Sequence, residues 1–434
     1  MLVSPYGPAP TRKATLINGL TRRQRPYRGS HPLAIPRTAL AFELIEAYGA
    51  VTAEELLKAR AATVEEAERF HSSDYIAALR RAEADGGLRD EDRARFNLGN
   101  AENPYFEQLY TIPATATGGS IAAAEEVING RVAFNPAGGM HHARAASAQG
   151  FCYLNDPVLA VMRLRKHGWR VLYVDIDAHH GDGIEAAFAD DPEVLTLSLH
   201  MDTAYAYPFA GGRFEDSGSE QGGRTTLNVP LPQGTHDAEY RHVFDAVWQP
   251  VVEKFSPAAI VLQAGADMLA ADPLGRLKIS TQCYLDVVKR VLEAAPRHAD
   301  GTPRLMVTGG GGYHPLLVAR AWTGVWGLLS GRDIPVGIPE AGTRVLRAAG
   351  WTTDEDEPYF PALFASRLDA MLPSPLRPQL RELAARALEH PFLSASYQPE
   401  TLNLKLKSIS RVRIGRSLRP TVRWVPEIMI TRGG

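Results

Sequence analysis

Short apolar runs alternate with longer amphipathic stretches between residues 130 and 330. The apolar runs, which predict strands, are 131–135, 170–177, 194–199, 225–229, 258–263 and 304–308. The stretches with helical spacing are 155–167, 184–189, 238–254, 281–295 and 315–329. Strands that alternate with helices are typical of a parallel sheet covered by helices. The sequence therefore predicts an α/β fold: a single large domain with a mostly parallel central sheet flanked by helices on both faces.

The two ends of the chain have a less regular pattern. Before residue 130, the pattern predicts a strand at 14–17, an exposed charged loop at 85–95, and helices from 39 to Gly49 and at 52–60, 63–70, 74–83 and 115–128. We assign residues 1–340 to the main domain and 341–434 to a C-terminal extension that packs on it. Within this extension we expect a helix at 379–389 and a basic amphipathic edge strand at 404–414.

Composition excludes several classes of protein. The 434 residues carry a net charge of -2, which argues against a protein that is basic throughout and built for nucleic acid. Two cysteines, Cys152 and Cys283, cannot make a disulfide framework. With no long apolar run for a membrane span, we expect a soluble cytoplasmic protein. The eight Lys and Arg of 401–434 face one acid, Glu427, and we interpret them as charges that block edge-to-edge aggregation rather than as a nucleic-acid arm.

The strand at 170–177 ends in a group of acids and imidazoles. Side chains alternate faces along a strand, so Asp175, Asp177 and His179 should share one face. Two carboxylates and an imidazole crowded together are costly unless a cation joins them. This ligand set suits zinc, although Fe²⁺, Mn²⁺ and Co²⁺ are also compatible with it.

Three more strand ends carry candidate chemistry. His141 and His142 follow strand 131–135, Asp267 follows 258–263, and Tyr313 follows the run that ends at 308. Because parallel strands end at one edge of the sheet, we expect all these side chains in one site.

The residue types indicate metal-assisted hydrolysis. Asp177, His179 and Asp267 can supply three ligands and leave a fourth position open, as in catalytic metal sites. A neighbouring histidine can move a proton, and Tyr313 can donate to a developing oxyanion. From the residues alone, His141 and His142 are both candidates for the base, with Asp175 and Asp182 as candidate partners.

With these motifs assembled, the chain resembles the histone deacetylase superfamily, which has the arginase/deacetylase fold. The motifs are Gly138-Gly139-Met140-His141-His142-Ala143, Gly150-Phe151-Cys152-Tyr153-Leu154-Asn155-Asp156, 175–183, Gly265-Ala266-Asp267 with Asp272-Pro273-Leu274-Gly275, and 309–314. The chain is most similar to the bacterial acetoin-utilisation branch, through His31-Pro32, Leu98-Gly99 with Asn103-Pro104, and Asn228-Val229-Pro230.

The resemblance implies a role for each catalytic residue. It implies one zinc ion per chain at Asp177, His179 and Asp267, with His142 as general base and acid, His141 as its electrostatic partner, and Tyr313 on the carbonyl. It also implies that Asp175 pairs with His141 and Asp182 with His142. Potassium is expected at Asp175 and the main chain of Asp177, His179, Ser198 and Leu199, with a second site near Phe188, Asp191 and Val194.

The substrate residues implied by the resemblance include two departures from the family pattern. The implied residues are Gly150 and Phe151 with Tyr207 at a narrow tunnel, Leu274 nearby, Glu102 at the rim and Arg37 at an inner cavity. Glu102 stands where the family has an aspartate, and Tyr207 stands where phenylalanine is usual. Both changes bear on substrate choice rather than on the reaction.

We therefore predict a metal-dependent amidohydrolase that removes acetyl or other acyl groups from lysine Nε. The substrate would be an acylated lysine of a protein or a small acylated amine; no membrane or nucleic-acid partner is expected, and a homo-oligomer stays open. One alternative is a deacylase of acetylpolyamines or other small amides. An arginase-type ureohydrolase needs a second Asp-x-Asp pair, but Met268 and Leu269 follow Asp267. A non-catalytic acyl-lysine binder is the alternative from another class.

Overall fold

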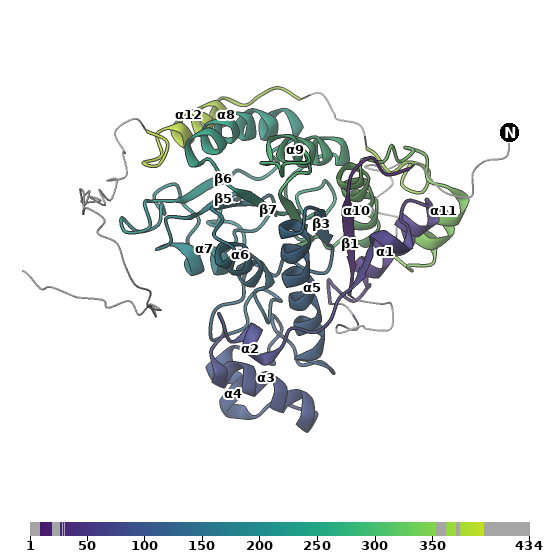
Figure 1. Cartoon of the computed structure of the whole chain (residues 1–434), viewed down its shortest axis with the longest axis vertical. Helices are drawn as coiled ribbons and strands as arrows, with labels where there is room; N and C mark the ends of the chain where they lie inside the picture. Colours follow the sequence, from purple (N-terminus) through teal and green to yellow (C-terminus); the bar gives the residue numbers. More distant parts are fainter. Residues whose placement is uncertain are drawn as a thin grey trace, which may run out of the picture. The chain divides into compact units, whose positions relative to one another are not determined.

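A parallel sheet runs through the centre of the protein (Figure 1). The structure is a computed structural model, and it describes residues 9–19, 27, 29, 31–352, 362–369 and 374–394. In this part of the chain the sheet has eight strands in the order β2-β1-β3-β8-β7-β4-β5-β6, and all neighbours are parallel. The strands are β1 Ala14–Asn18, β2 Leu56–Lys58, β3 Val132–Asn135, β4 Val171–Asp175, β5 Val194–Met201, β6 Thr226–Leu231, β7 Ala259–Gln263 and β8 Leu305–Thr308.

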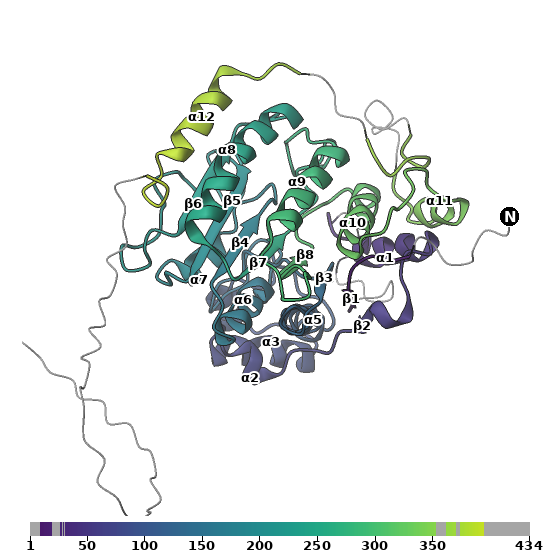
Figure 2. The same cartoon turned by 45° about the horizontal axis from the view of Figure 1, so that its top comes forward.

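Helices cover both faces of the sheet (Figure 2). The helices are α1 Arg37–Ala47, α2 Val64–Ala67, α3 Ser73–Asp85, α4 Asp90–Phe96, α5 Thr111–Ile128, α6 Asp156–Lys166, α7 Asp182–Phe188, α8 Asp237–Phe255, α9 Thr281–Ala294, α10 Pro315–Ser330, α11 Glu340–Arg347 and α12 Pro378–Leu388, with a 3-10 turn at Ala53–Glu55. The fold predicted from the sequence pattern, a parallel sheet between two layers of helices, is confirmed.

The alternation along β4 explains the two layers. Leu172 and Val174 enter the core that contains residues of α8, α9 and α10, whereas Val171 and Tyr173 enter the core that contains residues of α5 and α6. All four side chains are at most 1 % exposed. Burying each large apolar side chain contributes roughly 1.5–3 kcal/mol. Because β4 is apolar on both faces, it is stable only in the middle of the sheet, where helices cover both faces.

Two local predictions are wrong. Residues 52–60 form no α-helix: the 3-10 turn Ala53–Glu55 leads into β2, because Leu56 pairs with Leu16 of β1 at the sheet edge. Part of the predicted loop 85–95 is helix α4, whose Phe96 is 2 % exposed. Acidic residues in its first turn and Asn97 in a left-handed C-cap favour that helix.

The segment after residue 340 contributes two of the described helices. Helix α11 packs on α1, and α12 packs on α8. The predicted domain boundary at 340 stays a prediction, and the predicted strand at 404–414 lies outside the described residues, as does the basic segment 401–434. Among the helices described, none is both long and apolar enough to cross a membrane.

Candidate active site

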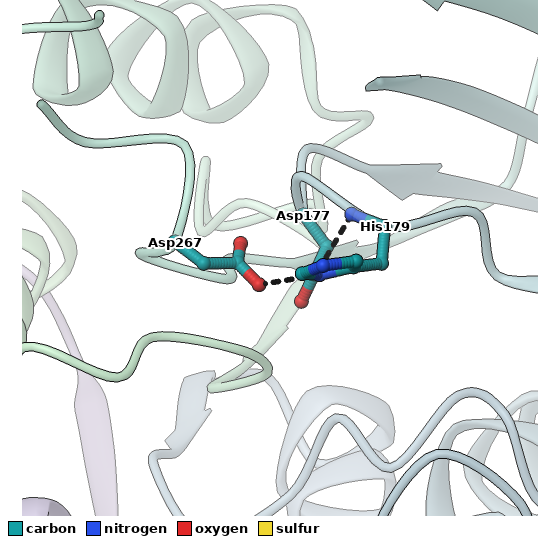
Figure 3. A group of neighbouring side chains, drawn as sticks. All are labelled: Asp177, His179 and Asp267. Carbon is teal, nitrogen blue, oxygen red and sulfur yellow. Dashed lines mark hydrogen bonds and ion pairs between the residues drawn. The ribbon is translucent and has the colours of Figure 1, made fainter. Parts of the chain in front are cut away.

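Asp177, His179 and Asp267 form a buried cluster beyond the carboxyl ends of β4 and β7 (Figure 3). Their candidate ligand atoms all lie within 4.8 Å of one another. His179 Nδ1 is 2.9 Å from Asp267 Oδ2 and 3.3 Å from Asp177 Oδ1. The predicted strand alternation through His179 is wrong, because β4 ends at Asp175. A loop, not a strand face, brings Asp177 and His179 together.

Hydrogen bonds from neighbouring strand ends hold the two carboxylates. Asp177 Oδ2 accepts from Gln263 Nε2 at 2.7 Å and from the backbone N–H of Gly311 at 2.6 Å. Asp267 Oδ1 accepts from the backbone N–H of Ala178 at 2.8 Å. A Cβ on Gly311 would overlap the carboxylate of Asp267, so only glycine permits this approach.

The cluster suits a divalent cation. Asp177 and Asp267 are 1 % and 0 % exposed, so two negative charges meet with little water. Burial raises the pKa of the Asp267 carboxyl, and the charge of Asp177 raises it further. Burial alone would lower the pKa of His179, but hydrogen bonds with Asp177 and Asp267 outweigh it and raise the pKa to about 10. A proton on the imidazole would offset the crowded charge, and a metal ion on the same atoms would do so more strongly.

His141 and His142 form two histidine–carboxylate pairs beside this cluster. Nδ1 of His141 is 2.8 Å from Asp175 Oδ2, and Nδ1 of His142 is 2.8 Å from Asp182 Oδ1. The two Nε2 atoms lie 3.1 Å apart. Each carboxylate thereby sets the orientation of one ring and directs its Nε2 atom toward the other histidine.

The two imidazoles differ in charge. Burial lowers the pKa of His141, but Asp175 and Asp177 outweigh it and raise the pKa to about 9. Burial lowers the pKa of His142 as well; the charge of His141 adds to this, and the pKa falls to about 4 despite Asp182. At neutral pH, His141 is therefore cationic and His142 is a neutral base.

Tyr313 lies next to the cluster of Asp177, His179 and Asp267. Its ring meets those of His179 and Phe151 edge-on, with centroids 6.2 Å and 6.1 Å away. Its backbone N–H donates to Asp272 Oδ2 at 2.7 Å, which fixes the end of the glycine-rich segment. Burial raises the pKa of the Tyr313 phenol well above its usual value, and nearby carboxylates, Asp267 first among them, raise it further. The phenol therefore stays a hydrogen-bond donor.

A cavity leads from the surface to these groups. Its lining includes Glu102, His142, Gly150, Phe151, His179, Tyr207, Leu274 and Tyr313. Leu274 is 37 % exposed at this opening. A smaller inner cavity is lined by Arg37, Met140, His141 and Cys152, and Arg37 Nη2 donates to Gly310 O at 2.6 Å. The structure thus places the expected substrate residues at the opening, except Arg37, which lies inside.

The residues named for potassium lie in two places. Asp175 pairs in register with Ser198 of β5, next to Leu199. At the other location, the N–H of Asp191 donates to Phe188 O at 3.0 Å, and the N–H of Val194 donates to Asp191 O at 3.1 Å. Both potassium sites stay predictions.

Sequence reasoning gave no role to three residues that position the site. The Gln263 amide donates a hydrogen bond to the carboxylate of Asp177, and the carboxylate of Asp272 accepts one from the backbone N–H of Tyr313. The carboxylate of Asp156 accepts hydrogen bonds from the backbone N–H groups of Gly139 and Met140. The available signal was a polar residue at the end of an apolar strand, for Gln263, or at a helix start, for Asp156. The long-range bonds of these residues cannot be read from either signal.

The parallel α/β fold, the buried Asp–His–Asp cluster and the two histidine–carboxylate pairs together define an enzyme of the deacetylase class. The profile described as histone deacetylase domain matches residues 31–329. The chain belongs to the histone deacetylase family.

Known proteins similar to this chain support that assignment. It is 40% identical over 314 residues to histone deacetylase 9 of Arabidopsis thaliana, covering 72% of each chain. It is 38% identical over 309 residues to histone deacetylase 8 of Xenopus tropicalis, covering 70% of this chain and 81% of that one. The crystal structure of an HDAC homolog from Aquifex aeolicus superimposes with a TM-score of 0.81 at 37% identity, covering 87% of this chain and all of the other. These relatives do not test the closer similarity to the acetoin-utilisation branch, which stays a prediction.

Proposed function

We propose that this deacetylase is a metal-dependent hydrolase that removes acetyl groups from the Nε atom of lysine side chains. One observation carries the proposal: His142, His179 and Tyr313 meet in a single cavity that opens to the surface. A base, a metal-type ligand and a phenolic donor in one cavity are the groups that amide hydrolysis needs.

Asp177, His179 and Asp267 would hold the cation. When bound, a divalent ion makes water more acidic and polarises an amide carbonyl. Zinc is the first choice for two carboxylates and one imidazole, and Fe²⁺, Mn²⁺ and Co²⁺ fit the same donors. Potassium at the Asp175 and Phe188 locations belongs to the same proposal.

The two histidines have different roles in proton transfer. His142 lines both the cavity that opens to the surface and the inner one, whereas His141 lines the inner one and not the outer one, so the attacking water meets His142. His142 accepts the water's proton at Nε2 and returns it to the leaving amine, while Asp182 holds its Nδ1. The cationic His141 stays beside it and favours the negatively charged transition state.

The remaining residues orient the substrate. Tyr313 donates its hydroxyl proton in a hydrogen bond to the carbonyl oxygen as negative charge develops there. Phe151 and Tyr207 lie on the lining of the opening, where aromatic faces suit the methylene chain of an acylated lysine.

An acyl panel on the purified, metal-analysed protein tests this proposal. Lysine peptides with acyl groups of increasing length are assayed beside acetylated polyamines, and the ratio kcat/KM is compared. The proposal expects the acetyl-lysine peptide to be hydrolysed efficiently. Preference for acetylpolyamines would support the small-amine alternative. Peptide binding with no turnover by the metal-loaded protein would support a non-catalytic binder, and either result would overturn the proposal.

A further inference from the structure

The side chain of Glu102 joins two other segments at the opening of the cavity. Its Oε1 atom accepts a hydrogen bond from the Tyr207 hydroxyl at 2.6 Å and another from the backbone N–H of Gly150. Glu102 precedes α5, Gly150 lies between β3 and α6, and Tyr207 follows β5. A single carboxylate oxygen therefore connects three segments that are distant in sequence. We call this pair of side chains the Glu102–Tyr207 latch.

Tight packing surrounds the latch. The Tyr207 ring meets the His142 ring edge-on, with centroids 4.8 Å apart. Gly150 has a φ of +55°, and a Cβ there would overlap the His142 ring and lie 2.8 Å from a ring carbon of Tyr207. The ring of Tyr207 thus fits between the mouth of the cavity and the catalytic histidine. It cannot swing outward without breaking its bond to Glu102.

The latch bond joins a phenol to a carboxylate. A hydroxyl that donates to a carboxylate makes a charge-assisted bond, stronger than one between neutral groups. Burial raises the pKa of the Tyr207 phenol, and the hydrogen bond to Glu102 raises it further. The Tyr207 hydroxyl therefore keeps its proton. A phenylalanine at this position would have no such anchor.

We propose that the Glu102–Tyr207 latch fixes the width of the opening and restricts the enzyme to small acyl groups, with acetyl preferred over branched or aromatic ones. This inference rests on the proposed function. An acyl group has to pass the opening lined by Phe151 and Tyr207 before it reaches His142 and Tyr313. A wall that is hydrogen-bonded in place excludes a bulky group, whereas a wall held by packing alone moves aside. Glu102 is thus a positioning residue, and Tyr207 determines specificity.

The test compares Tyr207→Phe with wild type on two peptides that differ only in the acyl group of lysine, acetyl or isobutyryl. The free energy of a hydrogen bond to a charged group corresponds to about a tenfold change in a rate constant. We therefore expect kcat/KM for isobutyryl relative to acetyl to rise about tenfold in Tyr207→Phe. Tyr205→Phe is the matched control: Tyr205 lies on the same loop, lines the same cavity and is 69 % exposed, but its hydroxyl makes no hydrogen bond to Glu102 within the described structure. We expect its selectivity ratio to equal that of wild type.

Two Glu102 variants separate the latch from a general loss of packing. Glu102→Gln keeps an acceptor oxygen, so its selectivity should stay near that of wild type, whereas Glu102→Ala should resemble Tyr207→Phe. Adding Glu102→Ala to Tyr207→Phe should cause little further change in the selectivity ratio, because both changes remove the bond that anchors the Tyr207 ring, and the Gly150 bond that Glu102→Ala also removes does not hold that ring. An unchanged ratio in Tyr207→Phe, or the same rise in Tyr205→Phe, would refute the latch. Wild-type protein that fails to hydrolyse the acetyl peptide would instead refute the proposed function.

Discussion

The carboxylate of Asp156 accepts a hydrogen bond from the backbone N–H of Met140 at 2.8 Å. It also accepts one from Gly139 at 3.0 Å and one from the Ser120 hydroxyl. Asp156 is the first residue of α6 and is fully buried. The helix start therefore fixes the turn that carries the next two residues, His141 and His142.

Asp156→Asn tests this link. The amide group replaces one acceptor oxygen with a donor, which opposes the N–H groups of the turn. We expect the histidine pair to shift and kcat to fall about 100-fold, since small displacements of catalytic groups cost that much. Metal content should not change. The matched control is Asp90→Asn, at the first position of α4 but with an exposed side chain, and it should retain the wild-type kcat. A wild-type kcat in Asp156→Asn would show that the anchor is dispensable.

The roles of His142 and Tyr313 predict that replacing either residue lowers kcat. His142→Ala removes the base and should lower kcat about 10³-fold. Tyr313→Phe removes one donor to the oxyanion and should lower kcat about 10²- to 10³-fold. Circular dichroism and metal content should match wild type in both, and the exposed His167→Ala serves as the control. Wild-type turnover by either variant would exclude the role assigned to that residue.

Gln263 should control metal affinity although it is not a ligand. Its Nε2 atom donates to Asp177 Oδ2, and its Oε1 atom accepts from the N–H of Gly265 at 2.8 Å. Removing a bond to a ligating carboxylate typically costs roughly 10- to 100-fold in metal affinity. We expect Gln263→Leu to lose zinc at chelator concentrations that wild type withstands, with added zinc restoring activity. Asp190→Asn, which changes an exposed acid, should behave like wild type. Equal zinc retention by Gln263→Leu and wild type would contradict this role.

His71 predicts how stability depends on pH. Burial lowers its pKa from 6.5 to about 4. Its Nε2 accepts from the N–H of Asn155 at 3.0 Å, which requires the neutral ring. Because the folded-state pKa is below the unfolded value, the unfolded chain takes up the proton first as the pH falls. This contribution is therefore complete above about pH 6.5 and is lost progressively toward pH 4, by roughly 3 kcal/mol.

Urea unfolding at several pH values measures this loss. We expect His71→Gln to flatten the curve between pH 6.5 and 4 relative to wild type, since glutamine has no such titration. His167→Gln, which changes an exposed ring, should leave the curve unchanged. Parallel curves for wild type and His71→Gln would assign the acid sensitivity to other groups.

The sequence predicted the fold wherever local pattern and tertiary packing agree. Strand β4 is apolar on both sides and is buried on both, so its pattern alone indicates a central strand. Residues 52–60 have a helical pattern, yet pairing with β1 makes part of them a strand. That outcome depends on a neighbour across the sheet, which local spacing does not contain.

In the candidate site, too, some features follow from local sequence pattern and others depend on distant contacts. Placing Asp177, Asp267 and Tyr313 at one sheet edge needed only the parallel order of strands. His71 shows the limit: its ring is 1 % exposed and has a hydrogen bond on each nitrogen. Asn155 is 84 residues further along the chain, so no local pattern reveals this contact.

Strand β8 lies between β3 and β7, although among the described strands it comes last in the sequence. Until it joins, the sheet is split into a β2-β1-β3 part, which carries the histidine pair, and a β7-β4-β5-β6 part, which carries Asp177, His179 and Asp267. A nascent chain on the ribosome thus contains Asp177, His179 and Asp267 before the strand that aligns them with the histidine pair. We therefore expect the complete site to assemble only after translation has passed Tyr313.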